Sequence, residues 1–371
     1  MKDRTRRHRE VAALAAAVCR DDVRAVPLLP ADDVVRAVRH HRVAPLAHVR
    51  LREHAPAIAE VLRRDRDEAK GLHIRVSMLL AQLDALLTDV PWVVFKGPVL
   101  SELAHPVPGL RPYGDLDLLV APEDLRTVSR ILLTAGWEVG DYEDMLRNPE
   151  TPGEMHWFTP VGVQVDLHWS MINMQSRRRL FDIPTGQLLA RRRRVRIGLA
   201  QAWTMDEADS LVHVALHAAL AGANRLSWML DVDQLARQVD DWHQVTERAW
   251  EWGAQAHLAL ALRRAGTTLG TPVPPEVYPL LGVSPAFLLL LDTVDRLSPV
   301  ASSRREAGVS RLVARAVRPG LLPTLTLVAR NAGQGVLDRL RPPVSAPPER
   351  VRAGDEALEL YLSTVERGAR G

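Results

Sequence analysis

Two acidic residues within one short apolar segment are the strongest chemical signal in this sequence. They are Asp115 and Asp117 in residues 114–120 (GDLDLLV), whose apolar character predicts a β-strand. Successive side chains on a strand point to opposite faces, so the two carboxylates share a face about 7 Å apart. Hard divalent cations prefer oxygen ligands of this kind. The pair therefore predicts a metal site such as metal-assisted phosphoryl transfer requires.

A third acid follows in a second strand-like segment, residues 163–169 (VQVDLHW). By the same alternation Gln164, Asp166 and His168 share one face of that strand. A carboxylate close to a histidine is also a frequent structural polar pair, so both readings of Asp166 are open. We expect Asp166 to join the metal site.

Two basic residues flank the first acidic segment. Lys96 and Gly97 end the apolar segment 93–95, and Arg111 begins the turn that leads to Asp115. The sequence contains only three lysines, so a lysine at this place indicates a compact point charge. A glycine beside it lets the backbone approach another group closely.

Together these segments resemble the nucleotidyltransferase superfamily of the DNA polymerase β type, and more closely a largely uncharacterised bacterial branch of it. The matching pattern is K-G (96–97), R-P-x-G-D-x-D-L-L-V (111–120) and V-D-L-H-W (165–169). The resemblance implies an α/β (α+β) core with a mixed β-sheet, flanked by all-helical N-terminal and C-terminal regions. It also implies an enzyme: a magnesium-dependent transferase that moves a nucleoside monophosphate from a triphosphate to a hydroxyl or phosphate acceptor and releases pyrophosphate.

The resemblance assigns roles to individual residues. Two Mg²⁺ ions and a nucleoside triphosphate such as ATP are expected, although the sequence does not reveal the base. The catalytic, metal-binding residues would be Asp115, Asp117 and Asp166, and the nucleotide contacts would come from Lys96, Gly97, Arg111 and His168.

Several of these roles have structural alternatives. The superfamily usually has Gly-Ser or Gly-Gly where this chain has Lys96-Gly97-Pro98. Lys96 could pair with the aspartates or contact the β- and γ-phosphates. Arg111 could reach phosphate or pair with Glu102 or Asp124. For His168, a structural hydrogen bond competes equally with a contact to nucleotide or acceptor.

The acceptor is expected to be a small molecule or a peptide natural product. One alternative is a toxin-like enzyme that acts on tRNA along the basic clusters 177–179 and 191–194. Nucleic acid is the less favoured partner because only 5% of residues are aromatic and the net charge is only +3. A non-catalytic nucleotide-binding module of the same fold is the second alternative.

A histidine pair lies further along the chain. His213 and His217 stand at helical i, i+4 spacing, and Trp228 and Asp231 follow. Zinc proteases with that spacing have Glu after the first His, but this chain has Val214, which argues against a zinc site. We expect a polar seam that borders the acceptor site or is structural.

Composition and periodicity give the expected organisation. Residues 1–88 predict a helical N-terminal subdomain, 89–204 the catalytic domain, and 205–371 a helical C-terminal domain. Strands are expected at 92–96, 115–120, 155–160, 163–169 and 193–198, with helices at 99–104 and 122–135. The single Cys19 fits a reducing cytoplasm, and residues 4–19 favour a surface helix over a targeting signal. No apolar run approaches the roughly 20 residues of a membrane span, so no membrane partner is expected.

Overall fold

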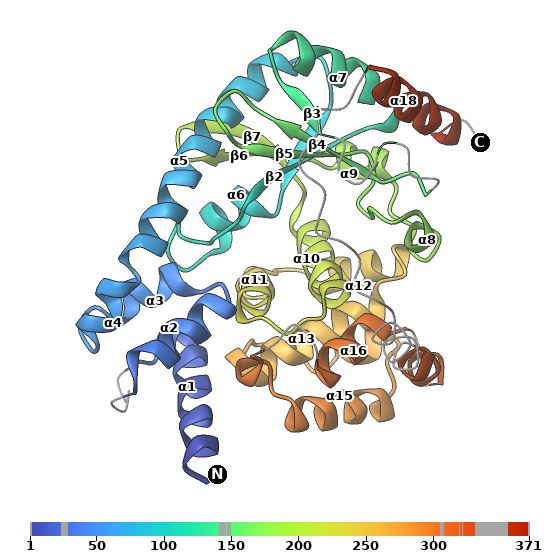
Figure 1. Cartoon of the computed structure of the whole chain (residues 1–371). Coiled ribbons are helices and arrows are strands. Elements are labelled where there is room, and N and C mark those ends of the chain that lie inside the picture. The colour runs from blue at the N-terminus through green and yellow to red at the C-terminus, as the bar shows by residue number, and fades with distance from the viewer. Residues whose placement is uncertain are drawn as a thin grey trace, which may run out of the picture. The chain divides into compact units, whose positions relative to one another are not determined.

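The computed structural model describes residues 2–23, 29–140, 146, 150–304, 308–318, 320, 322–330 and 355–369 (Figure 1). The chain forms two compact units. The sheet unit consists of residues 72–103, 113–206 and 343–371. The helical unit consists of residues 1–71, 104–112 and 207–342.

The sheet unit is built on five strands in the order β1-β2-β5-β4-β3. β2 and β5 are parallel, and the other neighbours are antiparallel. The sheet is therefore mixed, and the expected α+β fold class is confirmed. The strand bounds are β1 (Trp92–Phe95), β2 (Asp115–Val120), β3 (Glu138–Gly140), β4 (Glu154–Phe158) and β5 (Gln164–His168).

The strand expectations were mostly close to these bounds. A two-stranded hairpin, β6 (Arg193–Ile197) and β7 (Ala200–Thr204), contains the expected strand 193–198. β3 and β7 were not expected. β3 has only three residues, which is too short for alternation to be recognised from sequence.

Turn chemistry connects the strands as the sequence predicted. α7 (Leu125–Thr134) is preceded by a short 3₁₀ turn, η2 (Pro122–Asp124), and ends at Gly136, whose φ is 79°. The backbone N–H groups of Gly136 and Trp137 donate to the carbonyls of Leu133 and Leu132, which closes the helix end. The expected hairpin at 159–162 joins β4 to β5, with φ of 73° at Gly162.

One face of the sheet is apolar and forms the core of the sheet unit. Its inward residues include Leu116, Leu118, Trp157, Val165 and Leu167, all fully buried. The same core includes side chains of α5 (Arg63–Leu86) from residue 72 onward, of α7, of β6 and β7, and of α18 (Asp355–Ala369). Strand alternation therefore leaves the opposite face for the polar residues.

The last described helix, α18, belongs to the sheet unit although it lies near the end of the chain. Tyr361 and Leu362 are buried in the sheet core, and Arg126 of α7 pairs with Glu359 and Glu366 of α18. Figure 1 shows α18 beside α7. The expected border at 205 had placed this helix with the C-terminal helices, and the expected N-terminal subdomain had included residues 72–88.

The helical unit has its own core. Among the described residues its helices include α1 (Lys2–Arg20), α2 (Ala31–His40), α3 (Ala44–Leu51), α4 (Pro56–Val61), the start of α5, α10 (Glu207–Ala221), α11 (Leu226–Ala236), α12 (Trp242–Glu251), α13 (Gln255–Leu269), α14 (Val277–Leu280), α15 (Pro285–Leu297), η4 (Val300–Ser302) and α16 (Val309–Ala316). Local sequence sets several ends. Asp241 caps α12, Ser284 caps α15 with Pro285 following, and Gly270 ends α13 at φ 74°.

Candidate active site

Strand register gathers the predicted acids on the polar face of the sheet. In the parallel pair β2–β5, Asp117 lies opposite Asp166 and Asp115 opposite Gln164. Residues directly opposite each other in neighbouring strands present their side chains to the same face. Asp115, Asp117 and Asp166 therefore converge on one surface, as their spacing predicted.

Lys96 reaches this surface from the end of β1. Its backbone has φ 53° and ψ −127°, a conformation that costs a residue with a side chain of the order of 1–3 kcal/mol. The strained turn connects β1 directly to the short helix α6 (Gly97–Val99), which continues as a π-helical turn, η1 (Leu100–Ala104). It places the Lys96 Nζ atom 2.7 Å from Asp117 Oδ1. Of the two readings of Lys96, the pairing with an aspartate is observed.

Gly97 is required by close packing. A Cβ atom at this position would lie 3.3 Å from the Asp115 carbonyl oxygen and 3.4 Å from the Tyr113 ring. The absent side chain therefore lets the start of α6 approach the acidic end of β2. Contact of Gly97 with a nucleotide stays a prediction.

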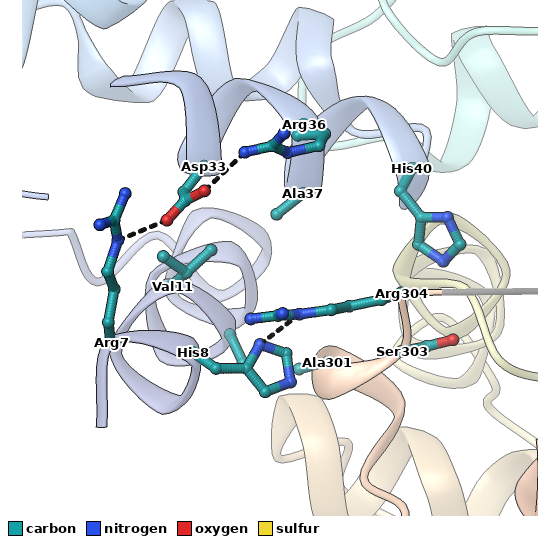
Figure 2. A pocket seen from close by; sticks show the side chains of 11 residues that line it. Arg7, His8, Val11, Asp33, Arg36, Ala37, His40, Ala301, Ser303 and Arg304 are labelled. Atoms are coloured by element: carbon teal, nitrogen blue, oxygen red, sulfur yellow. Dashed lines mark hydrogen bonds and ion pairs between the residues drawn. The ribbon is translucent and has the colours of Figure 1, made fainter. Parts of the chain in front are cut away.

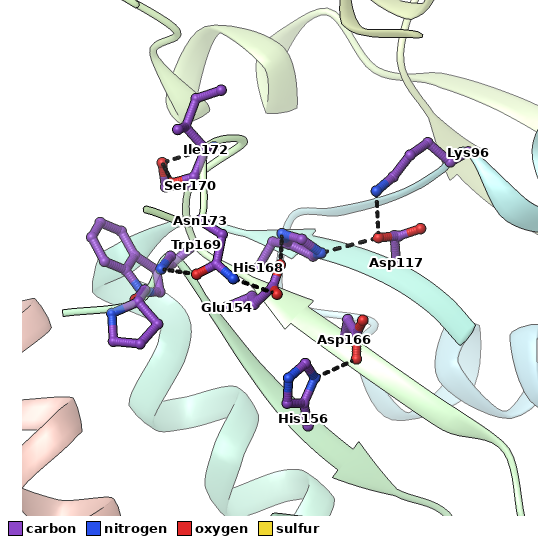
Figure 3. A network of polar contacts seen from close by, with 12 residues as sticks. Lys96, Asp117, Glu154, His156, Asp166, His168, Trp169, Ser170, Ile172 and Asn173 are labelled. Carbon is purple, nitrogen blue, oxygen red and sulfur yellow. Dashed lines mark hydrogen bonds and ion pairs between the residues drawn. The ribbon is translucent and has the colours of Figure 1, made fainter. Parts of the chain in front are cut away.

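His168 lies between two carboxylates. Its Nε2 atom is 3.1 Å from Asp117 Oδ1, and its Nδ1 atom is 3.3 Å from Glu154 Oε2 (Figure 3). Burial by itself would lower the pKa of His168, but Glu154 and Asp117 outweigh it and raise the pKa. His168 as a whole is only 5% exposed. These contacts favour the structural reading, in which His168 orients Asp117 from behind.

Glu154 completes this chain of contacts from β4. It lies opposite His168 in the antiparallel pair β4–β5, and its Oε1 atom accepts a hydrogen bond of 2.6 Å from Asn173 Nδ2. Figure 3 shows the chain running from Lys96 through Asp117, His168 and Glu154 to Asn173. The predicted metal ligand Asp117 thus has a fixed rotamer, as outer-shell partners of metal ligands commonly provide.

Asp166 has a separate set of partners. His156 Nδ1 lies 2.6 Å from Asp166 Oδ1, and Gln164 Nε2 donates to the same oxygen at 2.9 Å. Burial would lower the pKa of His156, but its hydrogen bond to Asp166 raises it. Sequence reasoning missed both His156 and Glu154. The signal was the alternation of residues 154–158 (EMHWF), with polar residues on one face.

The two acids of β2 differ in electrostatic state. Burial, and then the charges of Asp117 and Asp166, raise the pKa of Asp115 to about 6. Burial would also raise the pKa of Asp117, but Lys96 and His168 hold it well below its usual range. Three carboxylates that share one largely buried surface match the donor set for a hard divalent cation. The residues present therefore fit the expected metal.

Arg111 belongs to the helical unit, and its relation to the acids stays a prediction. Its Nε and Nη2 atoms donate to both carboxylate oxygens of Asp231, at 2.7 and 2.8 Å. Sequence reasoning did not foresee this partner, which is 120 residues away.

The predicted histidine pair lies in the same unit. The ring centroids of His213 and His217 are 6.2 Å apart, and the His217 ring meets the Trp228 ring edge-on at a centroid distance of 6.5 Å.

A cavity of about 570 Å³ lies within the helical unit (Figure 2). Arg7 and Arg36 on its wall both pair with Asp33, and Arg304 Nε donates to His8 Nδ1. No predicted site residue lines this cavity among the residues described. The chemistry that the sequence predicts is therefore placed on the sheet face and not in this cavity.

The two basic clusters also belong to the sheet unit. Arg178 donates to the backbone carbonyls of Thr151, Ile172 and Asn173. Arg192 and Arg194 stack on Trp203, at 4.7 and 5.1 Å from the ring centroid. These three guanidinium groups hold loops and strands in place, which weakens the reading of the clusters as a nucleic-acid track.

Within the described part of the chain, no helix has the length and apolarity needed to cross a bilayer. A search of curated proteins gave no match. A family model described as an uncharacterised nucleotidyltransferase matches residues 29–270, which include every residue of the predicted site. The chain therefore belongs to this nucleotidyltransferase family, and its class of activity is the transfer of phosphorus-containing groups.

Proposed function

We propose that the protein transfers a nucleoside monophosphate from a nucleoside triphosphate, such as ATP, to a hydroxyl or phosphate acceptor, with release of pyrophosphate. The observation that carries this proposal is the register of β2 and β5, which sets Asp117 directly opposite Asp166 with Asp115 on the same face. Membership of a nucleotidyltransferase family supports the reaction class.

In this proposal Asp115, Asp117 and Asp166 hold the divalent ions, for which two Mg²⁺ are the expectation. When bound, such ions stabilise the attacking and leaving oxygens of an in-line displacement. Most of the remaining work is positioning and charge neutralisation. His168 and Glu154 contribute by holding Asp117 in one orientation.

Lys96 has two successive partners in this proposal. Its ammonium now lies 2.7 Å from Asp117 Oδ1, an oxygen that would also serve a metal ion. Lys96 would have to leave that oxygen when Asp117 holds a divalent ion, because like charges repel. Lys96 would then turn to the triphosphate, whose β- and γ-phosphates offer several negative oxygens.

The proposed acceptor is a small molecule or a peptide. Support comes from the basic clusters, in which Arg178, Arg192 and Arg194 bind groups of the protein itself.

The test is nucleotide transfer by single-acid variants. Asp115→Asn and Asp117→Asn should each lower transfer from radiolabelled triphosphates by at least about a thousandfold under saturating Mg²⁺, because each removes one metal-binding charge. Asp89→Asn, an exposed acid of the same unit, is the matched control and should behave as wild type. Full turnover in either site variant would refute the proposal. Triphosphate binding without turnover in the wild type would identify a non-catalytic module instead.

A further inference from the structure

The polar face of the sheet holds a second group of metal-ligating atoms beside the predicted acids. Glu154 and His156 come from β4 and Asp166 from β5, and one ligand atom from each lies within 4.8 Å of the other two. Their side chains are 16, 18 and 11% exposed. The group, called here the β4–β5 cluster, is therefore partly shielded from water, and its atoms already converge.

A second observation concerns His168, which lies next to the β4–β5 cluster. The Nδ1 atom of His168 is buried and has no hydrogen-bond partner among the described residues. It lies 3.3 Å from Glu154 Oε2 without hydrogen-bond geometry. A buried polar atom without a partner is rare in native proteins and calls for an explanation such as an ion or a rearrangement. The unexplained nitrogen of His168 lies directly beside one member of the β4–β5 cluster, Glu154.

The position of His156 suits a ligand. Its Nδ1 atom is 2.6 Å from Asp166 Oδ1. Two ligands on one ion stand roughly 3 Å apart, because each metal–ligand bond is about 2.1 Å long. A small outward movement of the imidazole would let an ion take the place of the proton that the two atoms share. Figure 3 shows the His156 ring turned toward Asp166 from the neighbouring strand.

The donor set indicates the class of metal. Mg²⁺ is bound through oxygen, whereas imidazole nitrogen suits Zn²⁺ and the neighbouring transition ions. We propose that Glu154, His156 and Asp166 form a binding site for a divalent transition ion of the Zn²⁺ type, distinct from the oxygen-only pair Asp115 and Asp117. The site deepens the proposed function and rests on it for one point, that Asp166 also belongs to the catalytic set.

The main alternative is that His156 only orients Asp166. A ligand and an orienting residue differ in metal selectivity. Loss of an orienting residue weakens every ion that Asp166 binds, whereas loss of a nitrogen ligand weakens Zn²⁺ selectively. The two roles of His156 also differ in the state of its imidazole ring, because only a metal ligand has a ring nitrogen bonded directly to the ion.

The experiment measures metal binding to the full chain without turnover. Zn²⁺ is titrated by calorimetry in the presence of excess Mg²⁺, and Mg²⁺ is titrated separately. His156→Ala should weaken Zn²⁺ binding at least about tenfold and change Mg²⁺ binding less than about threefold. The isosteric Glu154→Gln should weaken Zn²⁺ binding to a similar extent, and it is compared for Zn²⁺ alone because Glu154 also supports Asp117 through His168. His243→Ala, which removes an exposed histidine, is the matched control and should change neither.

A spectroscopic readout separates binding from fold. In protein with ¹⁵N-labelled histidine, Zn²⁺ should shift one ring nitrogen signal that is absent in His156→Ala, while Mg²⁺ leaves it in place. Unchanged Zn²⁺ affinity in both variants would overturn the site, as would equal weakening of Zn²⁺ and Mg²⁺ in His156→Ala. Asp117→Asn separates the two proposals, because it should lose transfer activity and keep the Zn²⁺-dependent signal.

Discussion

Asp115 and Asp117 lie two residues apart on one strand face, and their surroundings act on them in opposite directions. Asp117 has Lys96 at 2.7 Å and His168 at 3.1 Å, so its charge is compensated. Asp115 is desolvated and faces two other carboxylates, which raises its pKa to about 6. Sequence spacing makes the two acids equivalent, so this difference comes from their partners alone.

The two acids should therefore differ in their effect on stability. A carboxyl whose pKa is raised from 3.8 to about 6 loses folded-state stability as pH rises between those values. In metal-free protein Asp115→Asn should raise the free energy of unfolding by on the order of 1–2 kcal/mol at pH 7.5, after discounting for partial exposure. The gain should shrink as pH falls toward 4. Urea unfolding in EDTA across this pH range measures it.

Asp117→Asn should lower the free energy of unfolding. The substitution removes the negative charge that Lys96 and His168 share, which should cost about 3 kcal/mol of stability at pH 7.5. In the wild type the pKa of Asp117 is lowered, so the stabilisation by Asp117 is present above the usual Asp pKa and is lost only as pH falls below it. Equal shifts of the same sign in the two variants would contradict this account of the site.

Lys96 should distinguish nucleotides by their phosphate count. If its ammonium neutralises the β- and γ-phosphates, Lys96→Ala should weaken triphosphate binding roughly tenfold to a hundredfold, since hydrogen bonds to charged groups are worth about 1.5–3 kcal/mol. Monophosphate binding should change little. Calorimetry with saturating Mg²⁺ measures both, and Lys70→Ala on exposed surface is the control. Equal losses for the two nucleotides would remove the phosphate role.

At the scale of elements, the strand-to-helix turn after β1 stores strain so that Lys96 meets β2. The φ of 53° at Lys96 favours glycine. Lys96→Gly and Lys96→Ala remove the same ammonium, but only glycine relieves the backbone. Lys96→Gly should therefore be more stable than Lys96→Ala by about 1 kcal/mol in thermal or urea unfolding. A less stable glycine variant would show that the turn is not strained.

α18 is a second element whose role depends on packing. Leu362 is 4% exposed in the sheet core, whereas Leu360 on the same helix is 50% exposed. Leu362→Ala should lower the free energy of unfolding by about 2–4 kcal/mol, and Leu360→Ala by less than about 1 kcal/mol. Urea unfolding of both variants tests whether α18 stabilises the sheet unit. Equal small effects would mean that the helix contributes little.

At the scale of the whole molecule, the modest net charge of +3 argues against tRNA as the acceptor, as do Arg192 and Arg194, which stack on Trp203. A tRNA acceptor with six to ten phosphate contacts would lose about 10³–10⁵ in affinity between 50 and 200 mM salt. We expect tRNA binding to lose less than about tenfold over that range. Filter binding at both salt concentrations measures this. A steep salt dependence, together with loss of turnover on Arg191→Glu, would favour the tRNA-modifying alternative.

The sequence alone predicted the fold class and the family, both now confirmed, and it proposed a set of site residues. The catalytic roles of Asp115, Asp117 and Asp166 stay predictions. Strand alternation is a local rule that two or three residues reveal, so it correctly put Asp115 and Asp117 on one strand face. Helix ends such as Gly136 were predictable for the same reason, since a left-handed turn needs a particular residue at one position.

Tertiary structure alone decided how these segments meet. Which strand lies beside β2, and in what register, depends on the packing of the whole sheet. Only that register brings Glu154 and His156 to Asp166. The pairing of Arg111 with Asp231 and the return of α18 to the sheet join residues more than 100 positions apart. Local periodicity carries no information about such pairs, because their partners are selected by burial and charge compensation in the folded chain.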